Sequence, residues 1–577
     1  MKARILSTII ILLLITNVFS QTKRDINWKQ DLDYLKNYLE IVHPALHAYL
    51  AEAVFNEKFN YIRDNCETLD DTEIITRIAE IFAMIQDGHT GIDIGNKENK
   101  YIAGIFHKYP LLLYKFSDGL FAIWAKNEYS EIVGKKLLRI GNLKADEALE
   151  QMMRLNIGDN IMGRIQYLPL IQEYLQYTGV MDKSSDLLKL VYEDETGKES
   201  YLELKNPKSM LDAYMPPRIF GLNDSLVTAM NDDSKSPLPL YLSHIGEEFG
   251  GFPYTGEFYW YEYIPEQEAI YMQISVNVQK GDDPFDAFCK RMFNDLDSLQ
   301  AKKLIVDVRL NSGGNHFEMP LIKGIIERPQ IDTKGNLFLI TGRRTISASE
   351  HLTTQMETYT NATIFGEPTS ARPNMVGSIT PFTLPTSKLK CRTAKEYTQD
   401  SEYFDGRIMT KPAVYALLSS EDYKNNFDPV LSKIFMYPTI LKAKEKLRIA
   451  LQEGYHKDRI TGLQTAFNKN KKECVELGVN FESFLYDDFR LWVWYNKKED
   501  ADYLEYVKFL VEEVLPNSVI VNYGYAFGAF IGDKNEEAKK YFKKCLELNP
   551  AHSNAIKYFN LLKFNESVDY EVENYGW

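Results

Sequence analysis

The chain has 577 residues, 45% hydrophobic and 26% charged, which excludes a disordered or rod-like protein and leaves room for about three or four domains. Its formal charge of −14 at pH 7, without a long Lys/Arg run, argues against nucleic acid as a partner. Five widely spaced cysteines without a CxxC pair predict neither a disulfide framework nor a zinc cluster, and no metal is expected.

The first twenty residues have the pattern of a secretory signal peptide. Lys2 and Arg4 precede an apolar run at about 9–15, and Ser20 offers a small residue at a cleavage site. This run is shorter than the ~20 residues that a membrane span needs, although an uncleaved anchor is the alternative. The sequence therefore predicts an exported protein, periplasmic or extracellular, without a stable membrane span.

Two units are predicted in the first half of the chain after residues 1–20. Residues 21–98 carry apolar side chains at helical spacing, which indicates a small helical domain. Residues 99–205 contain short β-type runs, one helix and a closing hairpin. This order resembles a PDZ-like peptide-binding module, and a generic α+β insert is the alternative.

The second half predicts an α/β domain followed by helices. Residues 206–436 begin with a poorly periodic stretch and then alternate apolar strands with helices, which favours a largely parallel sheet. Residues 437–577 are mostly helical, and 523–550 resembles one tetratricopeptide repeat. These helices are interpreted either as a surface for a protein partner or as a stabilising appendage.

Ser347 stands where a predicted strand (336–342) gives way to a predicted helix (347–361). A hydroxyl at such a turn lies next to the free N–H groups of the helix N-terminus, which suits a nucleophile whose oxyanion needs stabilisation. Ser347 and Glu350 also have the spacing of a capping box, in which the serine only satisfies the helix N–H groups. Both interpretations stay open on these residues alone.

Two other motifs carry residues suited to catalysis. The predicted strand 303–310 is followed by Gly313 and Gly314, and paired glycines let a backbone approach a ligand and present N–H groups to it. His89 lies in the Gly-containing segment 86–90, and an ordinary histidine pKa of about 6.5 suits a general base near neutral pH. A lone histidine is more often structural.

In combination, these motifs resemble the tail-specific (C-terminal-processing) and tricorn-core serine protease family. The matching segments are DGHT at 87–90, D-x-R-x-N-x-G-G at 307–314, S-A-S-E at 347–350, G-E-x-T at 366–369 and FDPVLSKI at 427–434. The resemblance spans about residues 30–436 and implies a crotonase/ClpP-like α/β protease core. It also implies a peptide or unfolded-protein substrate and no cofactor.

The resemblance assigns roles to individual residues. Ser347 is the expected nucleophile, and backbone N–H groups of Gly313 or Gly314 and of Ala348 are the expected oxyanion hole.

The expected proton acceptor depends on the branch of the family. Arg372 occupies the position of the lysine base of the processing-protease branch, and an arginine cannot be deprotonated in proteins. The resemblance to the tricorn-like branch therefore makes His89 the expected base. Arg372 would then bind a substrate carboxylate or lie on the surface.

The third catalytic position and the rival bases come from less distinctive segments. Glu402 is the expected residue that orients the histidine, and Asp405 is the next candidate. His316 and His351 are rival bases, because one follows the glycine turn and the other lies four residues after Ser347.

The sequence thus predicts an exported serine endopeptidase that uses Ser347 and His89. The alternative is a catalytically inactive peptide-binding scaffold on the same fold, which the missing lysine and the repeat-like C-terminal helices motivate.

Overall fold

The computed structural model describes most of the chain, namely residues 26–93, 105–166, 168–207, 240–242, 257–402, 405–496, 500–549 and 552–564. The predicted signal peptide at 1–20 and most of the poorly periodic stretch 206–255 lie outside these residues. None of the described helices has both the length and the apolar character to cross a bilayer.

Four helices form the N-terminal unit: α2 (Trp28–Val42), α3 (Leu46–Tyr49), α4 (Glu52–Asn65) and α5 (Asp71–Ile85). Asn27 and Asp70 cap α2 and α5 by accepting N–H groups of the first turn. The apolar sides of the helices pack on one another, so the predicted helical structure is confirmed. α5 ends at Gln86, whose left-handed backbone (φ 57°) turns the chain sharply into the segment 86–90.

The next unit contains two small antiparallel sheets. One has the order β3-β2-β6 and the other β5-β4-β7-β8. Their strands are β2 (Lys108–Phe116), β3 (Gly119–Ala125), β4 (Leu137–Ile140), β5 (Leu143–Lys144), β6 (Pro169–Ile171), β7 (Leu187–Glu193) and β8 (Glu199–Lys205). The helices are η1 (Asn127–Ile132), α7 (Ala145–Met153), α8 (Ile161–Ile165) and α9 (Gln172–Tyr177). The predicted strands, helix and hairpin are confirmed, and the PDZ-like comparison stays a prediction.

A six-stranded sheet of order β16-β13-β12-β11-β10-β9 forms the core. Its strands are β9 (Tyr259–Ile264), β10 (Ala269–Ile274), β11 (Lys303–Asp307), β12 (Leu337–Thr341), β13 (Thr363–Gly366) and β16 (Val414–Tyr415). All neighbours are parallel except β9 with β10, which confirms the largely parallel sheet. Short 3-10 turns, η4 (Leu240–Leu242) and η5 (Pro265–Gln267), accompany it.

Helices cover both faces of this sheet, because its central strands are apolar on both sides. Leu304 and Val306 face the cluster that α10 (Phe285–Ser298), α11 (Met319–Ile326) and α12 (Ala348–Tyr359) complete. Ile305 faces the cluster of the C-terminal helices. The parallel strands place the turns before α11 and α12 at one edge of the sheet, at the carboxyl ends of β11 and β12.

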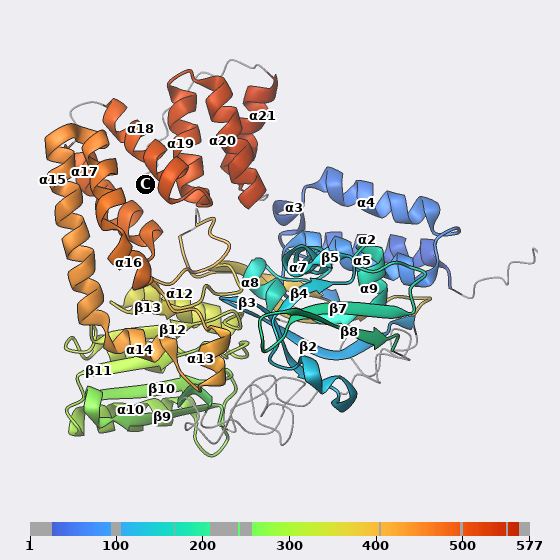
Figure 1. Cartoon of the computed structure of the whole chain (residues 1–577), viewed down its shortest axis with the longest axis horizontal. Helices are drawn as coiled ribbons and strands as arrows, with labels where there is room; N and C mark the ends of the chain where they lie inside the picture. The colour runs from blue at the N-terminus through green and yellow to red at the C-terminus, as the bar shows by residue number, and fades with distance from the viewer. Residues whose placement is uncertain are drawn as a thin grey trace, which may run out of the picture.

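A third small sheet, β1-β15-β14, connects the N-terminal helices to the core. β14 (Asn374–Thr383) and β15 (Lys390–Gln399) form an antiparallel hairpin, and β1 (Gly91–Ile92) pairs with β15 through Gly91 and Arg392. Since β1 directly follows the segment 86–90, this pairing brings the end of α5 to the chain that follows β13. In Figure 1 the blue N-terminal helices lie at the right and the green-to-yellow core sheet at the lower left.

The C-terminal part is helical, as predicted, and stands above the core sheet in Figure 1. Its helices are α13 (Ser420–Lys424), α14 (Pro429–Phe435), α15 (Tyr437–Asn470), α16 (Lys472–Glu476), η6 (Glu482–Phe489), α17 (Arg490–Asn496), α18 (Asp500–Phe509), η7 (Leu510–Val514), α19 (Val519–Ile531), α20 (Asn535–Leu548) and α21 (Ser553–Phe564). A bridge between Val414 and Val479 joins this part to the edge of the sheet. The tetratricopeptide likeness stays a prediction.

Candidate active site

Ser347 occupies the N-cap position of α12 with an unusual backbone conformation. Its φ of 61° and ψ of −131° lie outside the regions that non-glycine residues favour, a strain that costs about 1–3 kcal/mol. Its side chain makes no capping hydrogen bond, so the capping interpretation is wrong. Glu350 is fully buried instead, and its Oε1 accepts a hydrogen bond of 2.7 Å from Thr410 Oγ1.

A glycine turn packs directly against Ser347. A Cβ on Gly313 would lie 2.6 Å from Ser347 Cβ, and Gly313 has a φ of 95°, so no larger residue fits there. Asn311 shapes the turn, because its Oδ1 accepts the Gly313 N–H at 2.8 Å and its Nδ2 donates to Asn277 Oδ1 at 2.7 Å. The turn after β11 and the turn before α12 therefore meet as one unit.

Two backbone N–H groups beside Ser347 are available to a bound oxyanion. The N–H groups of Ala348 and Gly314 donate to no acceptor within the described part of the chain. The Gly313 N–H, also expected in the oxyanion hole, is already used by Asn311. The Gly313 N–H is therefore occupied, whereas the N–H groups of Ala348 and Gly314 remain without an acceptor among the described residues.

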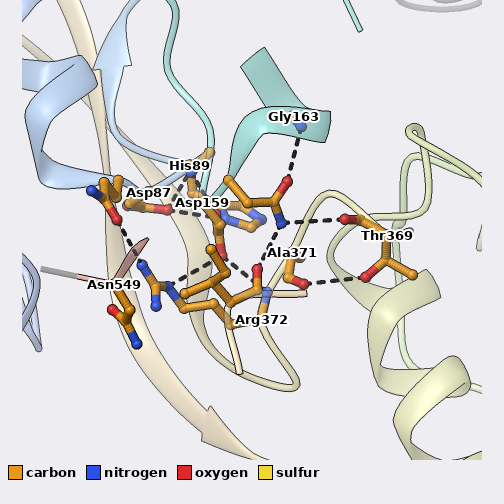
Figure 2. Close-up of polar contacts among 12 residues, drawn as sticks. Asp87, His89, Asp159, Gly163, Thr369, Ala371, Arg372 and Asn549 are labelled. Carbon is orange, nitrogen blue, oxygen red and sulfur yellow. Dashed lines mark hydrogen bonds and ion pairs between the residues drawn. The ribbon is translucent and has the colours of Figure 1, made fainter. Parts of the chain in front are cut away.

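His89 is held in the corner that follows α5. Its backbone N–H donates to Asp87 Oδ1 at 2.8 Å, and its ring Nδ1 lies 3.4 Å from the same oxygen. The second oxygen of Asp87 accepts from Thr90 Oγ1 at 2.5 Å and lies 3.3 Å from His43 Nε2. Figure 2 shows Asp87 and His89 side by side.

The charges in this corner favour ionised groups in spite of burial. Burial opposes the charged form of His89, but the hydrogen bond and charge of Asp87, aided by Asp159, raise its pKa above the ordinary value. Burial also opposes ionisation of Asp87, yet His43 and His89 hold the pKa of this carboxyl well below its usual range. Asp87 is therefore an ionised, fully buried carboxylate.

The corner around His89 meets the turn that carries Ser347. A Cβ on Gly88 would lie 3.0 Å from Ile346 Cδ1, so the residues that precede His89 and Ser347 pack on each other. On the other side, a Cβ on Gly377 of β14 would lie 3.9 Å from His89 Nε2. No hydrogen bond between Ser347 Oγ and His89 is present among the described residues.

Arg372 lies beneath this corner rather than on the surface. It is 5% exposed, its backbone N–H donates to Asp159 Oδ2 at 3.2 Å, and its Nε lies 4.0 Å from that oxygen. Its Nη2 donates to Gln86 Oε1 at 3.3 Å, and its guanidinium lies 4.5 Å from the centre of the Tyr49 ring. Figure 2 shows the carboxylate of Asp159 between Arg372 and His89.

Asp159 connects Arg372 to the histidine corner. Its Oδ1 accepts the Gly88 N–H at 2.8 Å, while its other oxygen faces Arg372. Burial, together with the charge of Asp87, raises the pKa of Asp159, and Arg372 opposes that rise. Because Arg372 is buried, its interpretation as a surface residue is wrong. Its polar contacts are with Gln86 and Asp159.

Glu402, the residue expected to orient the histidine, does not lie against His89 in the described structure. Glu402 is exposed, and its carbonyl oxygen accepts from Asn374 Nδ2 at 2.8 Å. Asp405 forms ion pairs with Arg407. In the parts of the chain that the structure describes, neither carboxylate contacts His89.

The rival histidines are engaged with other groups. His351 Nδ1 contacts Asp400, and the rings of His351 and His316 lie 4.3 Å apart. His316 Nδ1 lies 3.3 Å from Glu318 Oε1. Neither ring contacts the Ser347 hydroxyl among the residues described.

Sequence reasoning missed the groups that surround His89. Asp87 was part of the DGHT motif but received no role, although a carboxylate two residues before a histidine is itself a signal. His43 and Asp159 lie in segments without a catalytic motif, and only the fold brings them to the corner.

One segment of the core matches the model of a known protein family. Residues 323–412 match the model of peptidase family S41. This segment, 90 of the 577 residues, contains Ser347 and is similar to that peptidase family. A comparison with curated protein sequences gives no match.

Several solved structures match parts of the chain at low sequence identity and low TM-score. Mature CPAF has a TM-score of 0.45 and 12% identity, over 71% of this chain and 97% of that chain. The photosystem II D1 C-terminal processing protease has a TM-score of 0.29 and 11% identity, over 69% and 94% of the two chains. The tricorn protease has a TM-score of 0.29 and 13% identity, over 71% of this chain and 36% of that chain.

Proposed function

We propose that this protein is an exported endopeptidase that cleaves peptides or unfolded proteins through Ser347, with His89 as general base. The observation that carries the proposal is the turn at Ser347. The backbone of Ser347 is strained, its hydroxyl makes no capping hydrogen bond, and the N–H groups of Gly314 and Ala348 have no acceptor among the described residues. Strain of this kind persists at functional sites because the surrounding structure enforces it.

The proposed reaction follows from these groups. The Ser347 hydroxyl gives its proton to His89 Nε2 while its oxygen attacks the peptide carbonyl carbon. The N–H groups of Gly314 and Ala348 stabilise the oxyanion, and the protonated histidine then gives its proton to the leaving amine. Water then gives a proton to His89 Nε2 while its oxygen attacks the acyl carbon, and the histidine returns that proton to the Ser347 oxygen as the acyl bond breaks.

Two features of the proposal come from the sequence. Export rests on the signal-peptide pattern at 1–20, and a protein partner for the C-terminal helices rests on the repeat-like segment 523–550. Secretion of a tagged chain, with the mass of its mature N-terminus, tests export. The partner is tested by a protein that co-purifies with the intact chain and does not co-purify with a chain that lacks residues 523–577.

The central test compares the wild type with Ser347→Ala and His89→Ala. We expect both variants to lose cleavage of an unstructured protein such as casein, and Ser347→Ala to lose labelling by a fluorophosphonate. Unchanged cleavage by Ser347→Ala would contradict the proposal.

The scaffold alternative has one structural observation in its favour, namely that no described hydrogen bond joins Ser347 and His89. Binding of casein by the wild type without cleavage and without fluorophosphonate labelling would favour that alternative.

A further inference from the structure

The carboxylate of Asp87 lies beside His89 and exchanges no proton in the proposed reaction. We propose that Asp87, held in place by His43 and Thr90, is the positioning residue that fixes the tautomer and orientation of His89. This inference rests on the proposed function, and it gives Asp87 the role for which the sequence suggested Glu402.

One oxygen of Asp87 faces two groups of His89. This oxygen, Oδ1, accepts the His89 backbone N–H at 2.8 Å and lies 3.4 Å from the ring Nδ1 of the same residue. A carboxylate facing Nδ1 favours the tautomer with the proton on Nδ1, which leaves the lone pair on Nε2. Nε2 is the atom that a base opposite a serine uses.

His43 fixes the other side of Asp87. The Ala45 N–H donates to His43 Nδ1 at 3.2 Å, so a neutral His43 carries its proton on Nε2. That Nε2 lies 3.3 Å from Asp87 Oδ2, and both side chains are completely buried. Thr90 Oγ1 donates to the same oxygen. With donors at both oxygens, the carboxylate has a single orientation.

The charges around the corner support this role. Burial lowers the pKa of His89, and Arg392 on β15 lowers it further, whereas Asp87 and Asp159 raise it and outweigh the lowering effects. The ionisable groups that face the corner from the neighbouring elements are His43, Tyr49, Asp159, Arg372, Arg392 and His351. Beside these groups stands Asp87, whose carboxylate lies 3.4 Å from the ring Nδ1 of His89.

The first test is Asp87→Asn, assayed by the rate of fluorophosphonate labelling and by kcat and KM on casein. An amide at this place donates to Nδ1 and forces the proton onto Nε2, the atom that must accept the serine proton. We expect labelling and kcat to fall by at least ~100-fold with KM nearly unchanged, as expected when a buried aspartate no longer fixes the histidine tautomer. The acid limb of the residual pH profile should move to lower pH.

The second test uses two variants of His43. Glutamine keeps an N–H donor near the place of Nε2, whereas leucine keeps the volume and removes the donor. We expect His43→Gln to label at a rate close to that of the wild type, and His43→Leu to label several-fold more slowly. A simple packing role for His43 would not separate the two variants in this way.

A matched control is Asp33→Asn, which removes an exposed carboxylate from the same helical unit, where it pairs with Arg63. Thermal melting establishes which variants fold, and if Asp87→Asn does not fold, the His43 pair decides. Equal labelling rates in the wild type, His43→Gln and His43→Leu would overturn the inference.

The competing assignment is tested in parallel by Glu402→Gln. A loss of activity there, with a folded Asp87→Asn within twofold of the wild type, would overturn the role of Asp87 and support Glu402. Failure of the proposed function has a different signature, namely cleavage that persists in Ser347→Ala.

Discussion

Arg309 and Asp428 form a buried ion pair between the end of β11 and the start of α14, with Arg309 Nη1 3.0 Å from Asp428 Oδ1. Arg309 Nε also lies 2.8 Å from Asp307 Oδ2, so one guanidinium serves two carboxylates. Asp428 in turn caps α14 by accepting the Val430 N–H at 2.8 Å. The D-x-R motif at 307–309 and the FDPVLSKI segment at 427–434 are therefore joined by the ion pairs of Arg309.

Replacing Arg309 should destabilise the core strongly. Arg309→Met would leave Asp307 and Asp428 buried without a cation, and we expect the free energy of unfolding to fall by about 3–5 kcal/mol. Urea denaturation followed by tryptophan fluorescence measures the change. The control is Lys302→Met, which breaks an exposed pair with Glu268 and should cost less than about 1 kcal/mol. Similar losses in the two variants would contradict this account.

Gly313 should tolerate no side chain. In Gly313→Ala, the new Cβ meets Ser347 Cβ at 2.6 Å, so the nucleophile must move, and a displacement of about 1 Å costs on the order of 100-fold in rate. The measurement is the rate of fluorophosphonate labelling of the folded variant.

Gly179→Ala provides the matched control for that variant. Gly179 also has a positive φ of 77°, but a Cβ there has no heavy atom within 4 Å. We expect it to lose about 1 kcal/mol of stability and to keep its labelling rate. If both alanine variants keep the wild-type rate, the close approach of Gly313 to Ser347 is not needed for activity.

The core sheet and the nucleophile turn could be predicted from the sequence because their signals are local. Strands such as 303–310 are apolar on both faces, and the motif residues lie at the ends of such strands. The position of Ser347 at the start of a helix followed from the same pattern.

The histidine corner could not be predicted in the same way, because it depends on pairings between distant parts of the chain. β1 pairs with β15 through Gly91 and Arg392, about three hundred residues apart. β14 mixes polar and apolar residues and contains Ser378 at φ 55°, which interrupts the two-residue alternation that marks a strand. Asp159 reaches Gly88 from a loop without any motif.

Glu350 should make the stability of the protein depend on pH. Burial raises the pKa of Glu350 from 4.5 to about 8, although hydrogen bonds from Thr410 and Thr369 oppose the rise. The protonated side chain thus stabilises the folded state fully below pH 4.5, and this contribution is lost as the pH rises toward 8.

Glu350→Gln should remove this dependence. The variant should gain stability relative to the wild type as the pH rises, by up to ~1.4 kcal/mol per pH unit within that window. Urea denaturation at several pH values measures the difference. Glu57→Gln, at an exposed position of α4, is the control and should run parallel to the wild type. A constant difference between Glu350→Gln and the wild type would show that Glu350 is already ionised in the folded protein.

Restoring a lysine at position 372 should not restore a lysine base. Arg372 packs over Tyr49 and faces Asp159 and Gln86, so a lysine at this place would have Asp159 as its partner and stay protonated. We expect the double variant His89→Ala, Arg372→Lys to be as inactive toward casein as His89→Ala alone. Arg372→Lys alone should keep His89 as the base and should be less stable than the wild type. An ammonium group replaces neither the stacking of the guanidinium on Tyr49 nor its contacts with Asp159 and Gln86. Casein cleavage by the double variant above that of His89→Ala would mean that position 372 faces the Ser347 hydroxyl during the reaction.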